Sequence, residues 1–597
     1  MKKAISLLLV VTMLTLAFTG CGKSEDDHGA EIPVYISDQI INFDPAFAYT
    51  DDAAVKILSL IYEGLTKIDS NGKVKNALLD SYTYKQQEDG TYLLECTLNE
   101  TCWSDGTTVS ADDFVYAIKR IMDPEFSSEA ACMLYQLKNA AKVKSGDVSI
   151  DDLGVRAADT SILQFIFDED IDVNIFMETL ASPALVPLRE VAVSTVENWS
   201  TTTNVLVTNG PFYVKKVAGD EELILERSQY YYRDVVKDKE DKYVTPYRLI
   251  ISYNADRELY QNETEITSNE LAQYAMLFSE DKPNSIVYNS DIALEKRGEA
   301  DTTSVDMLTQ HVYYFNTENE LFKNPDVRKA LSLALDRNEI VDIVKYASAA
   351  QGWIPGGVFA DSSRKTDYRE KYGSLISESA DLDTAKSLLK SAKVTKGSFT
   401  IKCKNSAVEK AIAEYAAGVW KKLGFTVTVK TLGYKTLSPS AETEFYTLYV
   451  DRLSEALKAR DFDVIAIDYT AMSTYAWGNI AQFSTDYSGA AISLKEITEN
   501  KDYVPDLTHV TGWQNDKFDS LIEEAAKIAD VSERSDKLFE AEKILIDEMP
   551  VVPLISYKNA YSKSKSLKGL ETNYYGATLF TDAKLSHYND YISEETF

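Results

Sequence analysis

The chain contains few of the residues that most often carry catalysis or bind metal ions. It has only five cysteines among 597 residues, and its four histidines are widely separated: His28, His311, His509 and His587. We find no Gly-x-Ser-x-Gly elbow, phosphate loop, dinucleotide fingerprint or His-Glu-x-x-His helix. The cysteine spacing fits no zinc motif. We therefore predict no catalytic residue, no metal site and no cofactor, and keep a membrane-anchored hydrolase only as an alternative from a different class.

Positive charge is also scarce. The chain has 62 Lys and Arg against 94 Asp and Glu, which gives a net charge of −32. Such a surface repels phosphate backbones, so nucleic acid is excluded as a partner. The excess of acid favours solubility, with a cationic class of ligand as the alternative.

Four cysteines lie beyond the N-terminal segment, at positions 96, 102, 132 and 403. Cys96 and Cys102 flank a short turn and could form a disulfide, but thiols buried in the core are favoured. Both interpretations stay open at the level of sequence.

A long apolar run occurs only at the N-terminus. Met1-Lys2-Lys3 is a positive segment, residues 5–18 are apolar, and Thr19-Gly20-Cys21 follows. This is the pattern of a secretory signal, and small residues before a cysteine resemble a lipobox. We expect a signal peptide over 1–20 and a polar tether over 21–31 that begins with lipidated Cys21. The alternative is an ordinary signal peptide with an incidental cysteine.

The stretch from Trp103 to Pro124 predicts a strand, a turn and a helix. Asp105-Gly106 favours a tight turn, and Ser110 and Asp113 have the spacing of a capping box. The apolar stripe that follows is the core-facing side of a helix; it consists of Phe114, Ala117, Ile118, Ile121 and Met122. On physical grounds alone, this segment has a structural role and carries no catalytic or binding residue.

The same stretch resembles the signature of the extracytoplasmic solute-binding proteins of ABC importers, in the oligopeptide, dipeptide and nickel class. Further strings resemble other segments of that family in the right order, at 44–45, 62–65, 209–212, 223–232, 322–341, 462–477 and 513–519. The resemblance covers most of the chain after the tether and is weakest over 255–310 and 433–460. We expect helices with irregular connections over 254–306 and a short strand over 551–554.

The resemblance implies an α/β fold of two lobes that close on a ligand like a hinge, a type II periplasmic-binding-protein fold with an extra subdomain. Lobe I would comprise 32–66, 204–312 and 506–597, with the additional subdomain at 67–203. Lobe II would comprise 313–505. The chain would then be a non-enzymatic receptor, held at the outer face of the cytoplasmic membrane by its lipid, on a Gram-positive-type cell surface or in a periplasm.

By the same resemblance, the partners are a peptide or peptide-like solute, ABC permease subunits with cytoplasmic ATPases, and the membrane through the lipid. The open alternatives are the same fold binding a sugar, an opine, a metal chelate or a signalling peptide. The implied ligand-binding residues are Tyr49, Thr50, Asp51, Asp468, Tyr469, Met472, Tyr475 and Trp477.

One of these positions departs from the family. Peptide-binding relatives place an Asp shortly after the 461–469 strand, where its carboxylate meets the ligand's α-ammonium. The matching position here is Met472, and a thioether carries no counter-charge. Either Asp468 substitutes, the loop is shifted, or the ligand has no free amine at its N-terminus.

Overall fold

The structure is a computed structural model of the chain. It describes residues 29–36, 40, 42–48, 52–126, 128–196, 199–201, 206–218, 222–232, 244–252, 286–288, 303–436, 449–471, 473–485, 487, 509–574 and 576–586.

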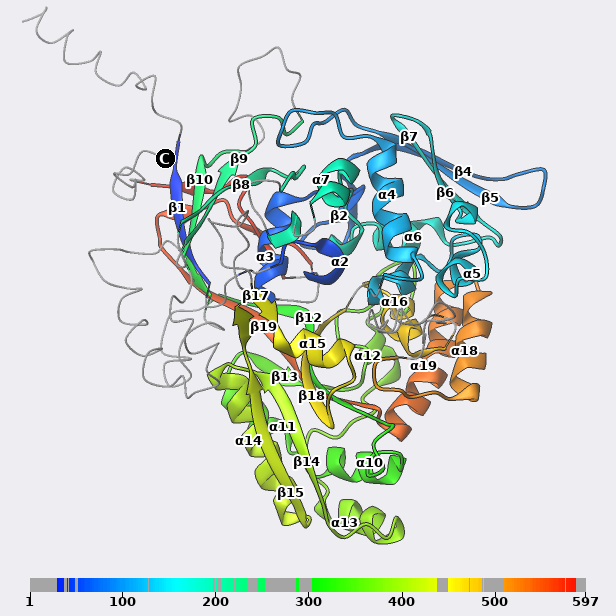
Figure 1. Cartoon of the computed structure of the whole chain (residues 1–597), viewed down its shortest axis with the longest axis vertical. Coiled ribbons are helices and arrows are strands. Elements are labelled where there is room, and N and C mark those ends of the chain that lie inside the picture. The colour runs from blue at the N-terminus through cyan, green and yellow to red at the C-terminus, as the bar shows by residue number, and fades with distance from the viewer. Residues whose placement is uncertain are drawn as a thin grey trace, which may run out of the picture.

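Among these residues, eleven strands form one large mixed sheet (Figure 1). In spatial order its main path runs through β15 (Phe425–Leu432), β14 (Gly397–Lys404), β18 (Val464–Thr470), β12 (Thr303–Phe315), β19 (Val551–Lys563), β11 (Ile286–Tyr288), β1 (Glu31–Tyr35), β10 (Arg248–Ser252), β9 (Glu222–Arg227) and β8 (Phe212–Ala218), while β13 (Ala347–Ala349) pairs with β19. A second sheet has the order β4 (Leu79–Gln86), β5 (Tyr92–Leu98), β7 (Ile162–Phe167) and β6 (Val155–Asp159).

The two longest strands, β12 and β19, hold the large sheet together. β19 pairs antiparallel with β12 on one side and with both β11 and β13 elsewhere along its length. In Figure 1 the strands β14, β15 and β18 lie in the lower half, whereas β1, β8, β9 and β10 lie at the upper left and the second sheet at the upper right. β12 and β19 therefore connect two separate parts of the molecule.

The expectation of a short strand at 551–554 is wrong, since β19 continues to Lys563. Proline removes a ladder donor and usually ends a central strand. Here Pro553 lies opposite Val312, at a register shift between His311 and Val312. An irregular point in the ladder tolerates the missing N–H, so the strand passes through.

The expectation of helices over 254–306 is also wrong for the residues of that range that the structure describes. They form β11 and the start of β12. The remaining residues of the range lie outside the described part of the chain.

The helices cover the sheets (Figure 1). The longer ones are α3 (Asp52–Ile61), α4 (Ala111–Met122), α10 (Pro325–Leu333), α11 (Arg337–Val344), α13 (Leu382–Ser391), α14 (Ala407–Lys422), α18 (Asp516–Ala526) and α19 (Val531–Glu548). The shorter ones include α2 (Pro45–Ala48), α5 (Ala140–Lys144), α6 (Val173–Thr179), α7 (Glu190–Thr195), α12 (Tyr368–Tyr372), α15 (Arg452–Lys458) and α16 (Ala476–Ile480). One connected cluster of buried apolar side chains runs through all these parts.

Helix α4 confirms the interpretation of the 103–124 stretch. Its five predicted stripe residues are buried, and the Asp113 carboxylate accepts hydrogen bonds from the backbone N–H (2.7 Å) and the hydroxyl (3.0 Å) of Ser110. Gly106 has a φ of +85° in the preceding turn, a conformation that glycine adopts without strain. At the far end, Arg120 forms a two-point ion pair with buried Asp44.

The four cysteines at 96, 102, 132 and 403 are free and buried, which confirms the thiol interpretation. Burial raises the pKa of the Cys96 thiol to about 12, so it is not a reactive thiolate at neutral pH. Among the described residues, no helix has the length and apolarity required to cross a bilayer.

Candidate functional site

The segment after β18 carries three of the eight predicted ligand-binding residues, Met472, Tyr475 and Trp477. It runs from Ala471 to Ser484, with Met472 outside the described residues, and we name it the β18 loop. Within it, Tyr475 precedes the short helix α16, which includes Trp477. Three further predicted residues, Tyr49, Thr50 and Asp51, also lie outside the described part of the chain, as does Cys21.

Tyr469 is buried beneath the β18 loop. Its ring lies 4.5 Å from the ring of Trp353, and its hydroxyl donates to the Asn479 side chain (3.2 Å) and accepts from Gln482 (2.9 Å). Asn479 in turn donates to the backbone oxygens of Ser473 and Tyr475 (2.8 and 3.0 Å). Through these hydrogen bonds, Tyr469 stabilises the conformation of the loop.

Tyr475 and Trp477 are the two aromatic residues of the loop itself. The Tyr475 hydroxyl accepts from Arg364 Nε (3.1 Å), whose guanidinium lies 5.3 Å from the tyrosine ring. Trp477 packs edge-on against Tyr487 at 5.4 Å. Its buried indole Nε1 has no hydrogen-bond partner among the described residues. A buried N–H without an acceptor is costly, so this donor is suited to a bound group.

The β18 loop is joined to the segment around α6, about three hundred residues earlier in the chain. The buried Glu178 carboxylate accepts hydrogen bonds from Ser473 Oγ (2.9 Å) and Thr474 N (2.7 Å). Tyr135 packs edge-on against Tyr487 at 4.9 Å, beside the loop. These contacts hold together two segments that the sequence resemblance assigns to different lobes.

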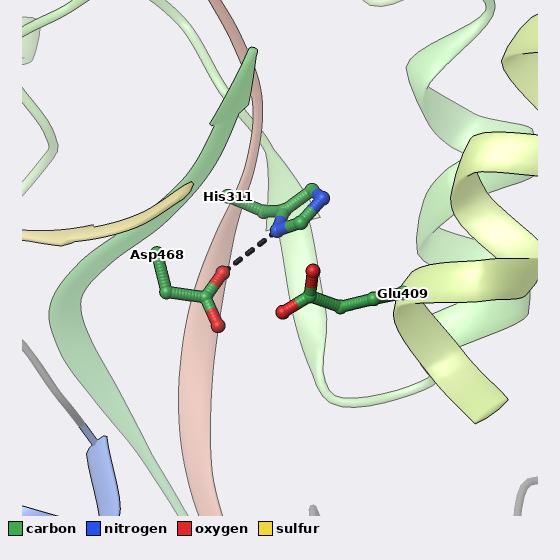
Figure 2. Close-up of side chains that lie close together, drawn as sticks. All are labelled: His311, Glu409 and Asp468. Carbon is green, nitrogen blue, oxygen red and sulfur yellow. Dashed lines mark hydrogen bonds and ion pairs between the residues drawn. The ribbon is translucent and has the colours of Figure 1, made fainter. Parts of the chain in front are cut away.

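Asp468 lies in a cluster that the sequence did not reveal. His311 on β12 is paired in register with Asp468 on β18, and His311 Nδ1 lies 2.7 Å from Asp468 Oδ1 (Figure 2). Glu409, in the first turn of α14, completes the group, and one ligating atom from each residue lies within 4.8 Å of the others. His311 is fully buried and Glu409 nearly so, while the Asp468 side chain is 29% exposed.

Burial and the charge of Asp468 together set the pKa values in this cluster. Burial, reinforced by the charge of Asp468, raises the pKa of Glu409 to about 7. Burial alone lowers the pKa of His311, but the hydrogen bond and charge of Asp468 raise it above the ordinary value overall. Asp468 therefore opposes ionisation of the Glu409 carboxyl and favours the charged form of His311, in a place with little solvent.

Sequence reasoning missed this cluster because its members lie far apart in the chain, at positions 311, 409 and 468. No local motif contains two of them. The only available signal was a lone histidine directly before the apolar and aromatic run 312–315.

Solved structures define the class of fold. The chain is similar to Listeria monocytogenes OppA bound to peptide, with a TM-score of 0.73 and 20% identity over 94% of this chain and 100% of that one. It is similar to the Escherichia coli murein tripeptide binding protein MppA, with a TM-score of 0.71 and 20% identity over 94% and 99%. The fold is therefore the two-lobed α/β fold of periplasmic binding proteins.

The family follows from the sequence comparison. The model for "Bacterial extracellular solute-binding proteins, family 5 Middle" matches residues 73–490, and the chain belongs to this family. It is similar to Bacillus subtilis oligopeptide-binding protein OppA, 25% identical over 98% of this chain and 99% of the relative. It is also similar to Bacillus subtilis dipeptide-binding protein DppE, 25% identical over 89% and 87%. The chain is accordingly a solute-binding protein rather than an enzyme.

Proposed function

We propose that this chain is the receptor of an ABC importer that captures oligopeptides or peptide-like solutes by lobe closure and delivers them to a permease. The observation that carries the proposal is the similarity, over nearly the full length of both chains, to relatives named for dipeptide and oligopeptide binding. ATP would be hydrolysed by cytoplasmic partners.

The proposed lobes are those expected from the sequence: 32–66, 204–312 and 506–597 in lobe I, 67–203 in its additional subdomain, and 313–505 in lobe II. Two features support this division. All four strands of the second sheet fall within 67–203, and β12 and β19 connect two parts of the large sheet.

Of the proposed binding residues, Tyr475 and Trp477 lie on the β18 loop, which hydrogen-bonds to the α6 segment. The Trp477 Nε1 donor, which has no acceptor among the described residues, and the Arg364–Tyr475 pair would supply polar groups, while the Tyr469 hydroxyl is hydrogen-bonded to Asn479 of the loop. Main-chain pairing would supply most of the affinity, as when a peptide adds a strand. Tyr49, Thr50, Asp51, Asp468 and Met472 complete the proposed set, and the three explanations for the missing amine-binding Asp remain.

We further propose that the chain is exported by its signal peptide, lipidated at Cys21 and held at the outer face of the cytoplasmic membrane. The sequence pattern at 1–21 supports this. Cleavage before Cys21 and a lipid adduct on that residue, measured by intact mass in membrane extracts, would test it. Chain recovered in the culture medium with a free thiol at Cys21 would contradict it.

The test of ligand class is native mass spectrometry of the full chain in mild detergent, incubated with a mixed peptide pool. We expect one intact peptide per protein. Met472→Asp is expected to enrich the bound peptides in those with free amino termini, because it places a carboxylate where peptide-binding relatives carry an Asp.

A matched pool of N-acetylated peptides is the control. Equal retention of free and acetylated peptides by the unchanged protein would show that no amine is recognised. No retained peptide, but a co-purifying compound of another kind, would overturn the peptide class and leave the family assignment intact.

A further inference from the structure

We propose that His311, Glu409 and Asp468 form a binding site for one divalent first-row transition-metal ion. The proposal concerns a site inside the part built by β12, β18 and α14, and does not depend on which solute the protein carries.

The first support is convergence. Three elements far apart in sequence each deliver one ligating side chain to the same point, with His311 and Asp468 directly opposite each other in the sheet. Figure 2 shows the Nδ1 face of His311 and both carboxylates directed toward a common space, while the second ring nitrogen points away. A structural metal needs this arrangement of side chains around one point.

The second support is charge. His311 Nδ1 and the Asp468 carboxylate face each other at 2.7 Å, and the Glu409 carboxylate lies beside them. Two carboxylates therefore lie next to one imidazole nitrogen in a largely buried place. Glu409 gains one backbone donor, Lys404 N at 3.1 Å, which only partly offsets its burial. A bound cation would offset the two negative charges.

The donor set limits the kind of ion. One imidazole nitrogen with two carboxylates suits Zn²⁺, Mn²⁺ and neighbouring first-row ions, whereas Mg²⁺ and Ca²⁺ prefer oxygen ligands alone. Metal–ligand bonds of roughly 2.0–2.2 Å place neighbouring ligand atoms roughly 3 Å apart. The His311–Asp468 separation of 2.7 Å is already close to that value, and side-chain rotation of Glu409 can bring its carboxylate nearer.

An ion can reach the cluster from solvent at Asp468, because this side chain is the most exposed of the three at 29%. An ion bound there would join β18 to α14 just before the β18 loop. It would also engage the Asp468 carboxylate, which favours a shifted loop or a ligand without a free amine over direct amine binding by Asp468.

The test is metal binding by the full chain in mild detergent. After chelator treatment and buffer exchange, we expect isothermal titration with Zn²⁺ or Mn²⁺ to show one equivalent bound. Titration with Co²⁺ should give a visible absorption band that depends on the same residues. Glu409→Gln and Asp468→Asn, which preserve shape, should each weaken binding at least about tenfold, as loss of groups in a metal site does.

The matched controls are Glu414→Gln, on the exposed side of α14, and Asp461→Asn, exposed before β18. Both should bind the metal as the unchanged protein does. Failure of the unchanged protein to bind any of the three ions would overturn the proposal. So would equal binding by Glu409→Gln, since metal would then lie elsewhere, for instance at other histidines. Circular dichroism of each variant confirms folding.

Discussion

His509 illustrates how a single buried side chain sets the response of this protein to acid. Its ring lies 4.3 Å from Phe483, and its Nδ1 accepts a hydrogen bond from the backbone N–H of Thr511 (3.3 Å). Burial, reinforced by the charge of Arg460, lowers the pKa of His509 from 6.5 to about 3. The neutral ring is therefore part of the folded state.

This pKa predicts a loss of stability in acid. Between pH 6.5 and about 3 the unfolded chain binds a proton at position 509 that the folded chain does not, so the free energy of unfolding falls as the pH drops. The loss has an upper limit of about 1.4 kcal/mol per pH unit. His509→Asn keeps an acceptor for Thr511 but cannot protonate, so its unfolding free energy should fall less steeply.

Urea unfolding at pH 7.5, 6, 5 and 4 measures the difference between the two proteins. We expect His509→Asn to be the less stable at pH 7.5, because ring packing is lost, and the gap to narrow in acid. Parallel pH profiles would show that His509 does not carry the effect.

At the scale of elements, the junction between α3 and β8 depends on one glycine. Gly210 donates its N–H to Ile61 O (2.8 Å) at the end of α3, two residues before β8 begins. A Cβ added at Gly210 would lie 2.4 Å from the carbonyl carbon of Ile61 and 2.6 Å from Tyr62 N. Both are backbone atoms, which cannot move aside as a flexible side chain can.

Gly210→Ala is therefore expected to destabilise the protein by about 3 kcal/mol or more, through backbone displacement. Gly418→Ala is the matched control, because Gly418 lies inside α14 with open space around its added Cβ. It should stabilise by about 0.5–1 kcal/mol, since alanine is the better helix former. Urea unfolding compares them, and similar losses in both variants would contradict the argument.

At the scale of the whole molecule, Glu178 links the α6 segment to the β18 loop across the fold. Removing its carboxylate leaves two buried donors without their acceptor, at a cost of about 1–3 kcal/mol for each unsatisfied group. Glu178→Ala should therefore loosen this link more than Glu178→Gln, because the Ser473 hydroxyl can rotate to accept from an amide.

Hydrogen exchange read by mass spectrometry checks this prediction. In Glu178→Ala, peptides from 173–182 and 471–484 should exchange faster, while those from β14 and β15 should not change. Glu169→Ala, at an exposed position, should leave all of them unchanged. Uniform acceleration across the chain would indicate global destabilisation instead of a local link.

Local patterns of the sequence predicted the helices well. The stripe and capping box of α4 are both present, because each depends on residues within a few positions of one another. Motifs in order along the chain likewise indicated the family.

What the sequence alone determined was therefore local: helix faces, caps, turns and the family signature. What only the tertiary structure decided was long-range. The passage of β19 through Pro553 depends on its pairing with β12, the Glu178 link joins residues about three hundred positions apart, and the His311–Glu409–Asp468 cluster needs β12, β18 and α14 side by side. Such contacts arise from sheet register and packing, and no short window of sequence contains both partners.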